Sequence, residues 1–297
     1  MGNRIAFELG FYGADAADAE IDLYDIAQAM IGFQRSLALT THLIIHDEII
    51  TQAPSLKDAS IFAATPEPGS WKLPAYLAFT ATALYKIGTA PHDTPLGHLV
   101  YSGYDYVVNQ SLGFRVDFDK SLGQQYEELE RNGSEIPKLK EYRFDSLIEK
   151  CETSIRDIHR PLYGRGTAEK ARIKASPSGT QLQKLGSDLT LDTYEYVRKS
   201  IRNPVPEQMM GSVSSYNNNT YRGRIFVPET GFPVPFTLTG NARSSNAVSL
   251  ITGSLVANAQ RRETGDEGLI YFYAHRVTSK NGRLKKLEIT AVSGQHF

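Results

Sequence analysis

Residues 268–292 read GLIYFYAHRVTSKNGRLKKLEITAV, two apolar runs that meet at a short polar turn. The dipeptide Asn281-Gly282 stands between the runs. A type I′ hairpin turn needs positive φ at both of its central residues, and Asn followed by Gly meets that need at little cost. The stretch therefore predicts an antiparallel hairpin with strands over 268–277 and 283–292.

The residues ahead of this hairpin predict the rest of a small C-terminal module. Short β-prone runs stand at 224–227 and 234–238, and apolar residues recur at helical spacing over 245–260. The resulting order is β-β-α-β-β. Such a module forms either a barrel-like structure or a sheet with one helix.

A linker is expected just before this module. Residues 211–221 are rich in Ser and Asn, a composition that is typical of chain connecting two folded parts. We therefore expect two domains, an acidic α+β domain over 1–210 and a basic, β-rich module over 211–297.

The first of these domains is predicted to mix strands and helices, with helical insertions. Asp22 can cap the first helix, because a carboxylate accepts hydrogen bonds from the amides of a helix's first turn. Residues 117–141 are polar and form either a helical hairpin or a long solvated loop, and residues 171–175 are an optional short strand. The other expected elements are a strand at 5–12, a helix at 22–43, strands at 60–64 and 70–79, and helices at 96–112, 144–158 and 189–201.

Charge is divided unevenly along the chain. Residues 1–150 hold 12 Lys and Arg against 21 Asp and Glu, and residues 151–297 hold 20 against 12, so the net charges are −9 and +8. An anionic partner for the second half would explain this division. Docking of the two halves on each other would explain the division equally well. The third alternative is that the two surfaces differ in charge without any functional consequence.

The composition favours a cytoplasmic protein without a membrane anchor. Cys151 is the single cysteine, so no intrachain disulfide can form, which fits a reducing compartment. The N-terminus, MGNRIAFELG, has no apolar core of a signal peptide. The uncharged stretch at 73–85 is too short to span a bilayer of roughly 30 Å.

A basic segment with three glycines and two prolines is the first candidate site. It runs from residue 160 to residue 179, and Glu169 is its only acidic residue. Glycines let backbone amides approach a phosphate while Arg and Lys supply charge, so the segment is a candidate anion site. It lacks the order of a P-loop, and a basic surface loop is the alternative. Its candidate residues are Arg160, Arg165, Lys170, Arg172 and Lys174.

The final hairpin holds the second candidate site. Alternation along the strand places Tyr271, Tyr273 and His275 on one face, opposite the apolar residues. Aromatic side chains beside basic ones, here Arg283 and Lys285, can hold single-stranded nucleic acid by stacking and phosphate contacts. The alternative is that the tyrosines pack on another part of the protein and the basic residues keep the hairpin soluble.

Catalytic patterns are weak throughout the sequence. His42 and His46 share a helix face, as zinc-binding pairs do, but lack the glutamate of a His-Glu-x-x-His motif. Cys151 stands at helical spacing among apolar residues, as a buried thiol does. Asp117 and Asp119 could offer oxygens to Mg²⁺. We expect no metal site and no cofactor.

Two clusters of residues resemble an uncharacterised family of bacterial proteins. Residues 22–33, DLYDIAQAMIGF, with Gly69-Ser70-Trp71-Lys72, resemble its N-terminal pattern. Residues 221–227, YRGRIFV, with 281–285, NGRLK, resemble its C-terminal module. The resemblance covers most of the chain, implies an association with antiviral defence, and carries over no functional residue.

These observations lead to three expectations of function. The first is a non-catalytic intracellular binding or regulatory protein, a component of a bacterial defence system that assembles with itself or with a partner protein. The second is nucleic-acid or nucleotide binding through the basic C-terminal half. The third is a metal-dependent enzyme such as a nuclease, built on Asp117 and Asp119.

Overall fold

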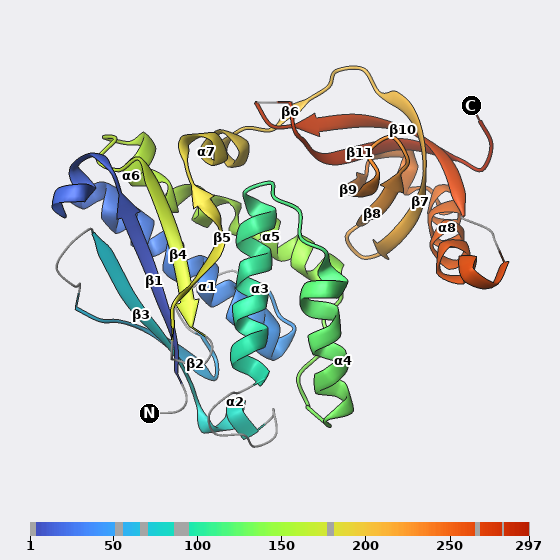
Figure 1. Ribbon diagram of the computed structural model, residues 1–297. Helices are drawn as coiled ribbons and strands as arrows, with labels where there is room; N and C mark the ends of the chain where they lie inside the picture. Colours follow the sequence, from blue (N-terminus) through green and yellow to red (C-terminus); the bar gives the residue numbers. More distant parts are fainter. Residues whose placement is uncertain are drawn as a thin grey trace. The chain divides into compact units, whose positions relative to one another are not determined.

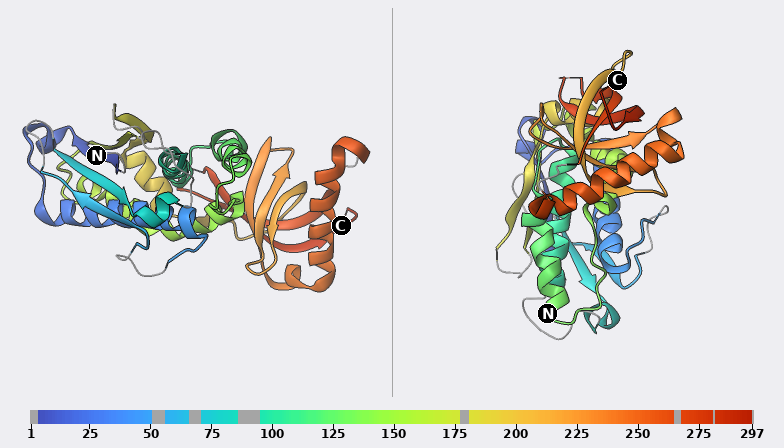
Figure 2. Two further views of the ribbon diagram at one scale, coloured as in Figure 1. Left: turned by 90° about the horizontal axis from the view of Figure 1, so that it is seen from below. Right: turned by 90° about the vertical axis from the view of Figure 1, so that its right-hand side faces the viewer.

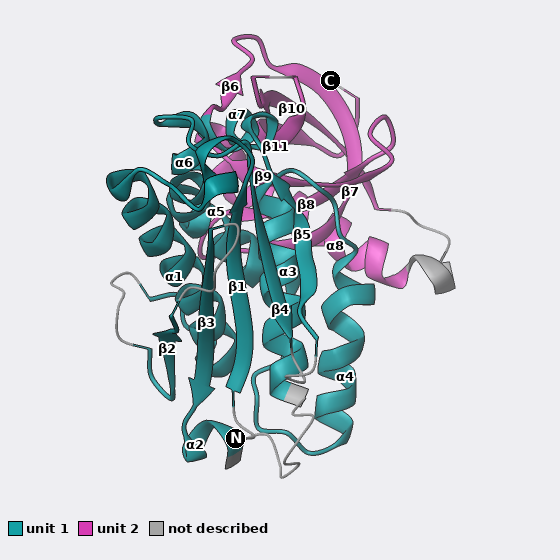
Figure 3. Ribbon diagram, turned by 60° about the vertical axis from the view of Figure 1, so that its left-hand side comes forward, with its two compact units in different colours: residues 1–198 teal, residues 199–297 magenta. Residues whose placement is uncertain are grey.

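The computed structural model describes residues 4–50, 56–65, 71–85, 95–176, 181–264, 268–280 and 282–296. The chain divides into two compact units, residues 1–198 and residues 199–297 (Figure 3). Each unit has a hydrophobic core of its own. The boundary expected from the sequence lies later in the chain, after residue 210.

Unit 1 is built on a sheet of five strands in the order β2-β3-β1-β4-β5, with antiparallel pairing throughout. The central strand β1 therefore has β3 on one side and β4 on the other. The strands are β1 (Arg4–Tyr12), β2 (Ala59–Ala63), β3 (Lys72–Phe79), β4 (Lys170–Ser176) and β5 (Gln183–Leu189).

Helices cover one face of this sheet. In Figure 3, α1, α3 and α5 form a layer behind the strands, and in Figure 1 α3 lies beside them. The helical elements of unit 1 are η1 (Ala14–Asp18), α1 (Leu23–His46), α2 (Ala81–Tyr85), α3 (Pro95–Ser111), the π-helical turn η2 (Asp119–Gly123), α4 (Gln124–Arg131), α5 (Glu141–Ile158), α6 (Arg160–Tyr163) and α7 (Leu191–Arg198).

The alternation of apolar residues decides which face the helices cover. Ile5, Phe7, Leu9 and Phe11 of β1 are each at most 2% exposed and belong to the core, whereas Glu8 lies between them on the opposite face. Side chains in a strand alternate between the two faces, so a run of alternate apolar residues buries one face against the helices.

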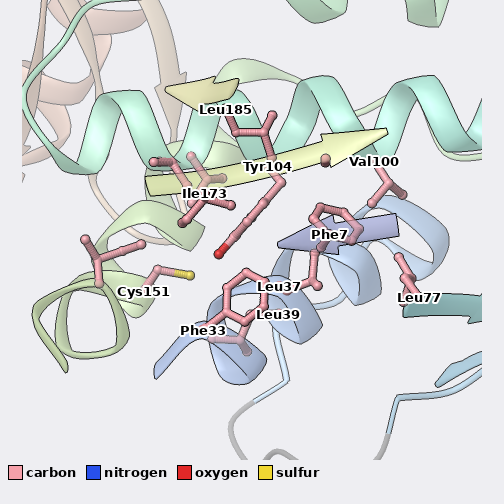
Figure 4. Close-up of a cluster of buried hydrophobic side chains, with 14 of the residues drawn as sticks. Phe7, Phe33, Leu37, Leu39, Leu77, Val100, Tyr104, Cys151, Ile173 and Leu185 are labelled. Atoms are coloured by element: carbon pink, nitrogen blue, oxygen red, sulfur yellow. The ribbon is translucent and has the colours of Figure 1, made fainter. Parts of the chain in front are cut away.

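The core of unit 1 contains a buried polar pair. Figure 4 shows Tyr104 of α3 among Phe7, Phe33 and Leu37. Its hydroxyl lies 2.9 Å from the Oγ of Ser36 on α1, and both side chains are fully buried. A buried hydroxyl needs a hydrogen-bond partner, so this pair lets a tyrosine occupy the centre of the core.

The strand-helix-strand-strand beginning predicted from the sequence is confirmed. Because β4 pairs with the free side of β1, strands β1 to β4 have the order 2-3-1-4, the connectivity of the ferredoxin-like split β-α-β fold. The segment between β3 and β4 holds α2 to α6, an enlarged helical layer. The optional strand at 171–175 is confirmed as β4, while the sequence did not predict β5.

Unit 2 is a closed five-stranded barrel with one extra strand. The sheet order is β11-β9-β8-β7-β10-β6, and β11 also pairs with β10, which closes the ring. β11 runs parallel to β9, and the other pairings are antiparallel. Its elements are β6 (Ile201–Arg202), β7 (Glu207–Asn217), β8 (Arg222–Val227), β9 (Phe232–Leu238), η3 (Gly240–Arg243), α8 (Ser245–Thr264), β10 (Leu269–Thr278) and β11 (Leu284–Ser293).

The barrel has the connectivity of the OB fold, in which five strands follow the order 1-2-3-5-4-1 and a helix joins the third to the fourth. Here β7, β8 and β9 are the first three strands, α8 is the joining helix, and β10 and β11 complete the ring. Figure 2 shows α8 lying against the strands of unit 2. The predicted barrel-like module with one helix is therefore confirmed.

The predicted linker at 211–221 is wrong, because residues 211–217 belong to β7. Their small side chains serve a close approach of two strands. A Cβ at Gly211 would overlap the backbone carbonyl oxygen of Phe226 on β8, and Ser212 is 4% exposed. A stretch whose composition is typical of a linker is here a strand that packs closely against its neighbour.

The predicted hairpin is confirmed as β10 and β11. Ile270, Phe272 and Ala274 face the barrel core, as their alternation predicts. Gly282 has φ +75, and Asn281 lies outside the described residues, as does the predicted turn at 66–69. The polar stretch at 117–141 is helical in part, through η2 and α4.

A substitution at Gly32 should test the close contact between α1 and α5. A Cβ there would overlap the carbonyl oxygen of Ser154, which belongs to the backbone of α5 and cannot turn aside. We expect Gly32→Ala to lower the free energy of unfolding of unit 1 by about 1–3 kcal/mol. Urea titration followed by the fluorescence of Trp71, the single tryptophan, measures this.

The matched control is the neighbouring residue Ile31, whose side chain is 56% exposed. Ile31→Ala should change the unfolding free energy by no more than about 0.5 kcal/mol. Equal stability of Gly32→Ala and wild type would show that the two helices do not pack at this distance.

Candidate functional site

The basic segment predicted to bind an anion is divided by the structure into two groups. Arg160 and Arg165 lie beside the N-terminus of α1, where they contact carboxylates of that helix. Arg172 and Lys174 lie on β4 and point away from the helical layer. Lys170 begins β4 and is exposed. The five residues therefore do not converge on one site.

Asp25 occupies the position that an anion would take beside Arg160. Its side chain is 2% exposed, and its two oxygens accept hydrogen bonds from the Nε of Arg160 at 2.8 Å and the backbone N–H of Arg165 at 2.9 Å. Both donors belong to the predicted anion-binding loop. The loop therefore holds an anion, and the anion is a carboxylate of the same unit.

The surroundings of Arg160 fix its guanidinium group. Its central carbon lies 5.2 Å from the ring centroid of Tyr24 and 5.2 Å from that of Tyr163. Tyr163 in turn stacks on Tyr194 of α7, with ring centroids 4.0 Å apart and an interplanar angle of 13°. This stack joins α1, α6 and α7 and gives Arg160 a structural explanation that needs no external ligand.

The second group forms ion pairs on the face of the sheet opposite the helices. Arg172 donates two hydrogen bonds of 2.8 Å to Asp188, and Lys184 lies 2.9 Å from the same carboxylate. These cations hold the pKa of Asp188 well below its usual range. Lys174 donates to Glu8 at 2.9 Å. Arg172 and Lys174, the two candidate anion-binding residues in this group, therefore have carboxylate partners within unit 1.

Net charge follows the boundary between the units. Residues 1–198 hold 20 Lys and Arg against 27 Asp and Glu, a net charge of −7, and residues 199–297 hold 12 against 6, a net of +6. The positive charge of the C-terminal half therefore belongs to the barrel, while the basic segment at 160–174 stands in a unit of negative net charge.

The hairpin candidates lie on the outer surface of this barrel. Tyr271 and Tyr273 are partly buried, and their neighbours across the sheet on β7 are Met210 and Gln208. The ring of Tyr271 meets that of His296 edge to face, with centroids 5.4 Å apart. The two tyrosines are therefore partly exposed on the same face of β10.

The remaining hairpin residues behave differently. His275 is not part of this row, because it is 7% exposed and its Nδ1 lies 2.7 Å from the carbonyl oxygen of Asn203. The extra strand β6 covers this end of β10. Arg283 is exposed beside the turn, and Lys285 donates to the Oγ of Ser200 at 2.9 Å.

Sequence reasoning missed a group of surface residues around β8. Phe226, Met210 and Leu269 are 37%, 42% and 41% exposed, and Arg243 is exposed above the ring of Tyr221. The alternation in residues 222–227 could have indicated an outward-facing Phe226. Arg243 and Tyr221 stand far apart in the sequence, so no local pattern pairs them.

The candidate catalytic groups are either buried or used within the fold. Burial raises the pKa of the Cys151 thiol to about 12, which leaves no thiolate at neutral pH. Asp117 accepts a hydrogen bond from the backbone N–H of Lys120, as a residue at the start of a helical turn does. Within the described ranges, no group of three or more His, Cys, Asp and Glu side chains is placed to hold a metal ion.

The two histidines of α1 form separate contacts with carboxylates. Their rings lie 4.7 Å apart, with His42 3.6 Å from Glu48 and His46 3.5 Å from Asp58. The pKa of His42 is lowered, first by its burial and then by the neighbouring His46.

Among the helices that the structure describes, none has the length and apolar character required to cross a membrane.

Comparison with known protein families gives a match over most of unit 1. A model described as a domain of unknown function, DUF7946, matches residues 7–193. The chain belongs to the DUF7946 family. The resemblance to an uncharacterised family is thereby confirmed.

A second model, described as a family of unknown function, DUF7947, matches residues 206–293 and so lies within the barrel of unit 2. A search of curated proteins finds no match to the chain. The DUF7946 domain thus corresponds to the sheet with its helical layer, and the second match corresponds to the barrel.

Removal of Asp25 should reveal the anion position in the DUF7946 domain. Asp25→Ala leaves two donors without an acceptor, and we expect it to lower the unfolding free energy of this domain by about 3 kcal/mol. Breaking a buried ion pair costs about 3–5 kcal/mol. We expect the lower value here because the side chain of Arg160 is 33% exposed, so water can solvate its charge. Inorganic phosphate at millimolar concentration should restore part of the loss, because an anion that binds only the folded state stabilises it.

The control for Asp25→Ala is Asp18→Ala, which removes an exposed negative charge from the same domain. It should leave the stability and the response to phosphate unchanged. An Asp25→Ala protein that gains no more from phosphate than wild type would contradict the role of Asp25 as the internal anion.

Proposed function

We propose that the protein is a non-catalytic binding protein whose C-terminal barrel holds nucleic acid. The observation that carries this proposal is the positive charge of the barrel, 12 Lys and Arg against 6 Asp and Glu, within a chain whose total net charge is −1. A nucleic acid presents closely spaced phosphates, and attraction between these and basic side chains supplies most of the non-specific binding energy.

Ion pairs inside the barrel join some of these charges to carboxylates of the same unit. Arg276 binds Glu207 and Glu229, and Arg202 binds Glu288. These pairs use three of the carboxylates of unit 2, Glu207, Glu229 and Glu288. The net charges of the two units, −7 and +6, favour the barrel over the basic segment at 160–174 as the anion-binding surface.

The architecture of the barrel supports the same proposal. Barrels with the OB connectivity bind oligonucleotides and oligosaccharides on the face of the second and third strands and in the adjoining loops. This likeness is one of fold, and one fold serves many functions. The partly exposed Tyr271 and Tyr273 add surfaces on which bases can stack. The setting that we propose, on the resemblance alone, is a bacterial defence system.

A salt titration should test nucleic-acid binding by the full-length protein. Affinity for a fluorescent single-stranded oligonucleotide should fall with a slope of log K against log salt of about −2 or steeper, since each phosphate contact contributes about −0.7. Replacing both Arg283 and Lys285 with Glu should weaken binding about tenfold or more and flatten the slope, because like charges then face the phosphates. Fluorescence anisotropy measures both quantities.

The control reverses two charges in unit 1. Lys120 and Lys138 have side chains that are 81% and 51% exposed, and replacing both with Glu should leave the slope as it is in wild type. Weak binding with a flat salt response in the wild-type protein would sink the proposal.

Assembly with itself or with a partner protein is the second candidate function. The opposite net charges of the two units, −7 and +6, favour assembly. The negatively charged unit 1 of one copy could attract the positively charged unit 2 of a second copy. We expect light scattering coupled to size-exclusion chromatography to give at least twice the monomer mass at low salt and the monomer mass at high salt. A strict monomer at low salt, with no copurifying protein, would count against assembly.

A further inference from the structure

One corner of the barrel presents an arginine stacked on a tyrosine. Tyr221 stands in the connection between β7 and β8, and Arg243 ends η3, the turn that follows β9. The guanidinium carbon of Arg243 lies 5.1 Å from the ring centroid of Tyr221. The Nε of Arg243 donates to the carbonyl oxygen of Leu238 at 2.8 Å, which fixes the plane of the group.

The connection that holds Tyr221 is itself well defined. Tyr221 has φ +55, a conformation that residues other than glycine rarely adopt, so the surrounding contacts must hold it. Its carbonyl oxygen accepts the N–H of Leu238 at 2.8 Å. The Oδ1 of Asn217 accepts the N–H of Asn219 at 2.9 Å. Arg243 and Tyr221 thus form a prearranged platform and not a chance surface contact.

Part of Arg243 remains available to a ligand. The residue is exposed, and its Nε is occupied by Leu238. Within the described part of the chain, no carboxylate lies in ion-pair contact with it, in contrast to Arg202 and Arg276 of the same unit. Its terminal nitrogens can therefore bind a phosphate while its plane offers a stacking surface.

Phe226 and two prolines lie on the outer side of β8 and β9, and alternation along β8 places Arg222 and Arg224 between Tyr221 and Phe226 on that side. Phe226 is 37% exposed on the outer face of β8, and its neighbour across the sheet is Pro233, which is also exposed. Pro235 is the next outward residue on β9. A β-strand rises about 3.3 Å per residue, so β8 places Phe226 roughly 15 Å from the corner.

We infer that the Arg243–Tyr221 corner and Phe226 form the two ends of a binding track for single-stranded nucleic acid. One base stacks on the outer plane of Arg243, a second stacks on Phe226, and the terminal nitrogens of Arg243 contact the intervening backbone. This inference rests on the proposed function. A duplex hides the faces of its bases within its own stack, so only an unpaired strand can use both surfaces.

The chemistry of the track distinguishes a nucleic acid from a protein partner. A protein partner would use the apolar surface at Phe226 without needing the stacked arginine. A single strand needs both, because its bases require flat surfaces and its phosphates require a cation beside them. The positive net charge of unit 2 favours the strand.

Binding of the full-length protein to three oligonucleotides of equal length should test this inference. The probes are a single strand, the same strand with abasic positions, and its duplex. We expect wild type to bind the intact single strand at least about tenfold more tightly than the abasic strand, since stacking contributes about 1–3 kcal/mol per base. Phe226→Ala and Arg243→Ala should each weaken binding of the intact strand by roughly tenfold.

Two further variants separate stacking from charge and from general damage. Arg243→Lys keeps the charge but removes the planar group, so it should retain the salt slope and lose part of the preference for the intact strand over the abasic strand, the part that stacking on Phe226 does not supply. Val256→Ala removes an exposed apolar side chain, 54% exposed, from α8 of the same unit and should bind as wild type does. Circular dichroism shows whether each variant is folded.

The outcomes separate this inference from the proposed function. A steep salt slope with equal affinity for intact and abasic strands would leave the proposed function standing and overturn the track. Binding of folded Phe226→Ala and Arg243→Ala at the wild-type level would overturn it as well. Absence of salt-dependent binding to all three probes would remove the proposed function and this inference together.

Discussion

The contact between Asp25 and the loop at 160–165 is the interaction on which unit 1 depends. Asp25 belongs to the first turn of α1, and the donors to its oxygens, Arg160 and Arg165, stand 135 and 140 residues further along the chain. The same loop leads into β4, which must reach β1 to complete the sheet. By holding the loop at the start of α1, the buried carboxylate sets where β4 begins, and the Glu8–Lys174 pair continues the match of charges along β1 and β4.

Local patterns in the sequence predicted much of the fold, because a few neighbouring residues are enough to indicate several of its elements. The alternation of β1, the cap at Asp22 and the hairpin turn near Gly282 are of this kind. β7 was missed for a physical reason: a narrow barrel needs small residues where two strands approach closely, and Gly211 with its serine neighbours has the composition of a linker. β5 was missed because its burial pattern does not alternate regularly.

The candidate sites depended on contacts between distant residues, and the sequence could not supply these. The sequence predicted that the basic residues of the 160–174 segment bind an anion, but no pattern indicated that Asp25, Asp188 and Glu8 pair with Arg160, Arg172 and Lys174. Likewise, Arg243 and Tyr221 are far apart in the sequence, and both form hydrogen bonds with the backbone of Leu238. The charge division along the chain therefore combines two causes, ion pairing inside unit 1 and an excess of basic residues in the barrel.

Closure of the barrel has a consequence for the order in which the molecule can form. β11 lies between β9 and β10 and closes the ring by pairing with both. During synthesis, unit 1 is complete before any barrel strand is available, whereas β7, β8 and β9 remain an open meander with an unpaired edge until residues 284–293 have left the ribosome. Exposed strand edges promote association between chains. The last strand thus governs how long the nascent protein is vulnerable to aggregation.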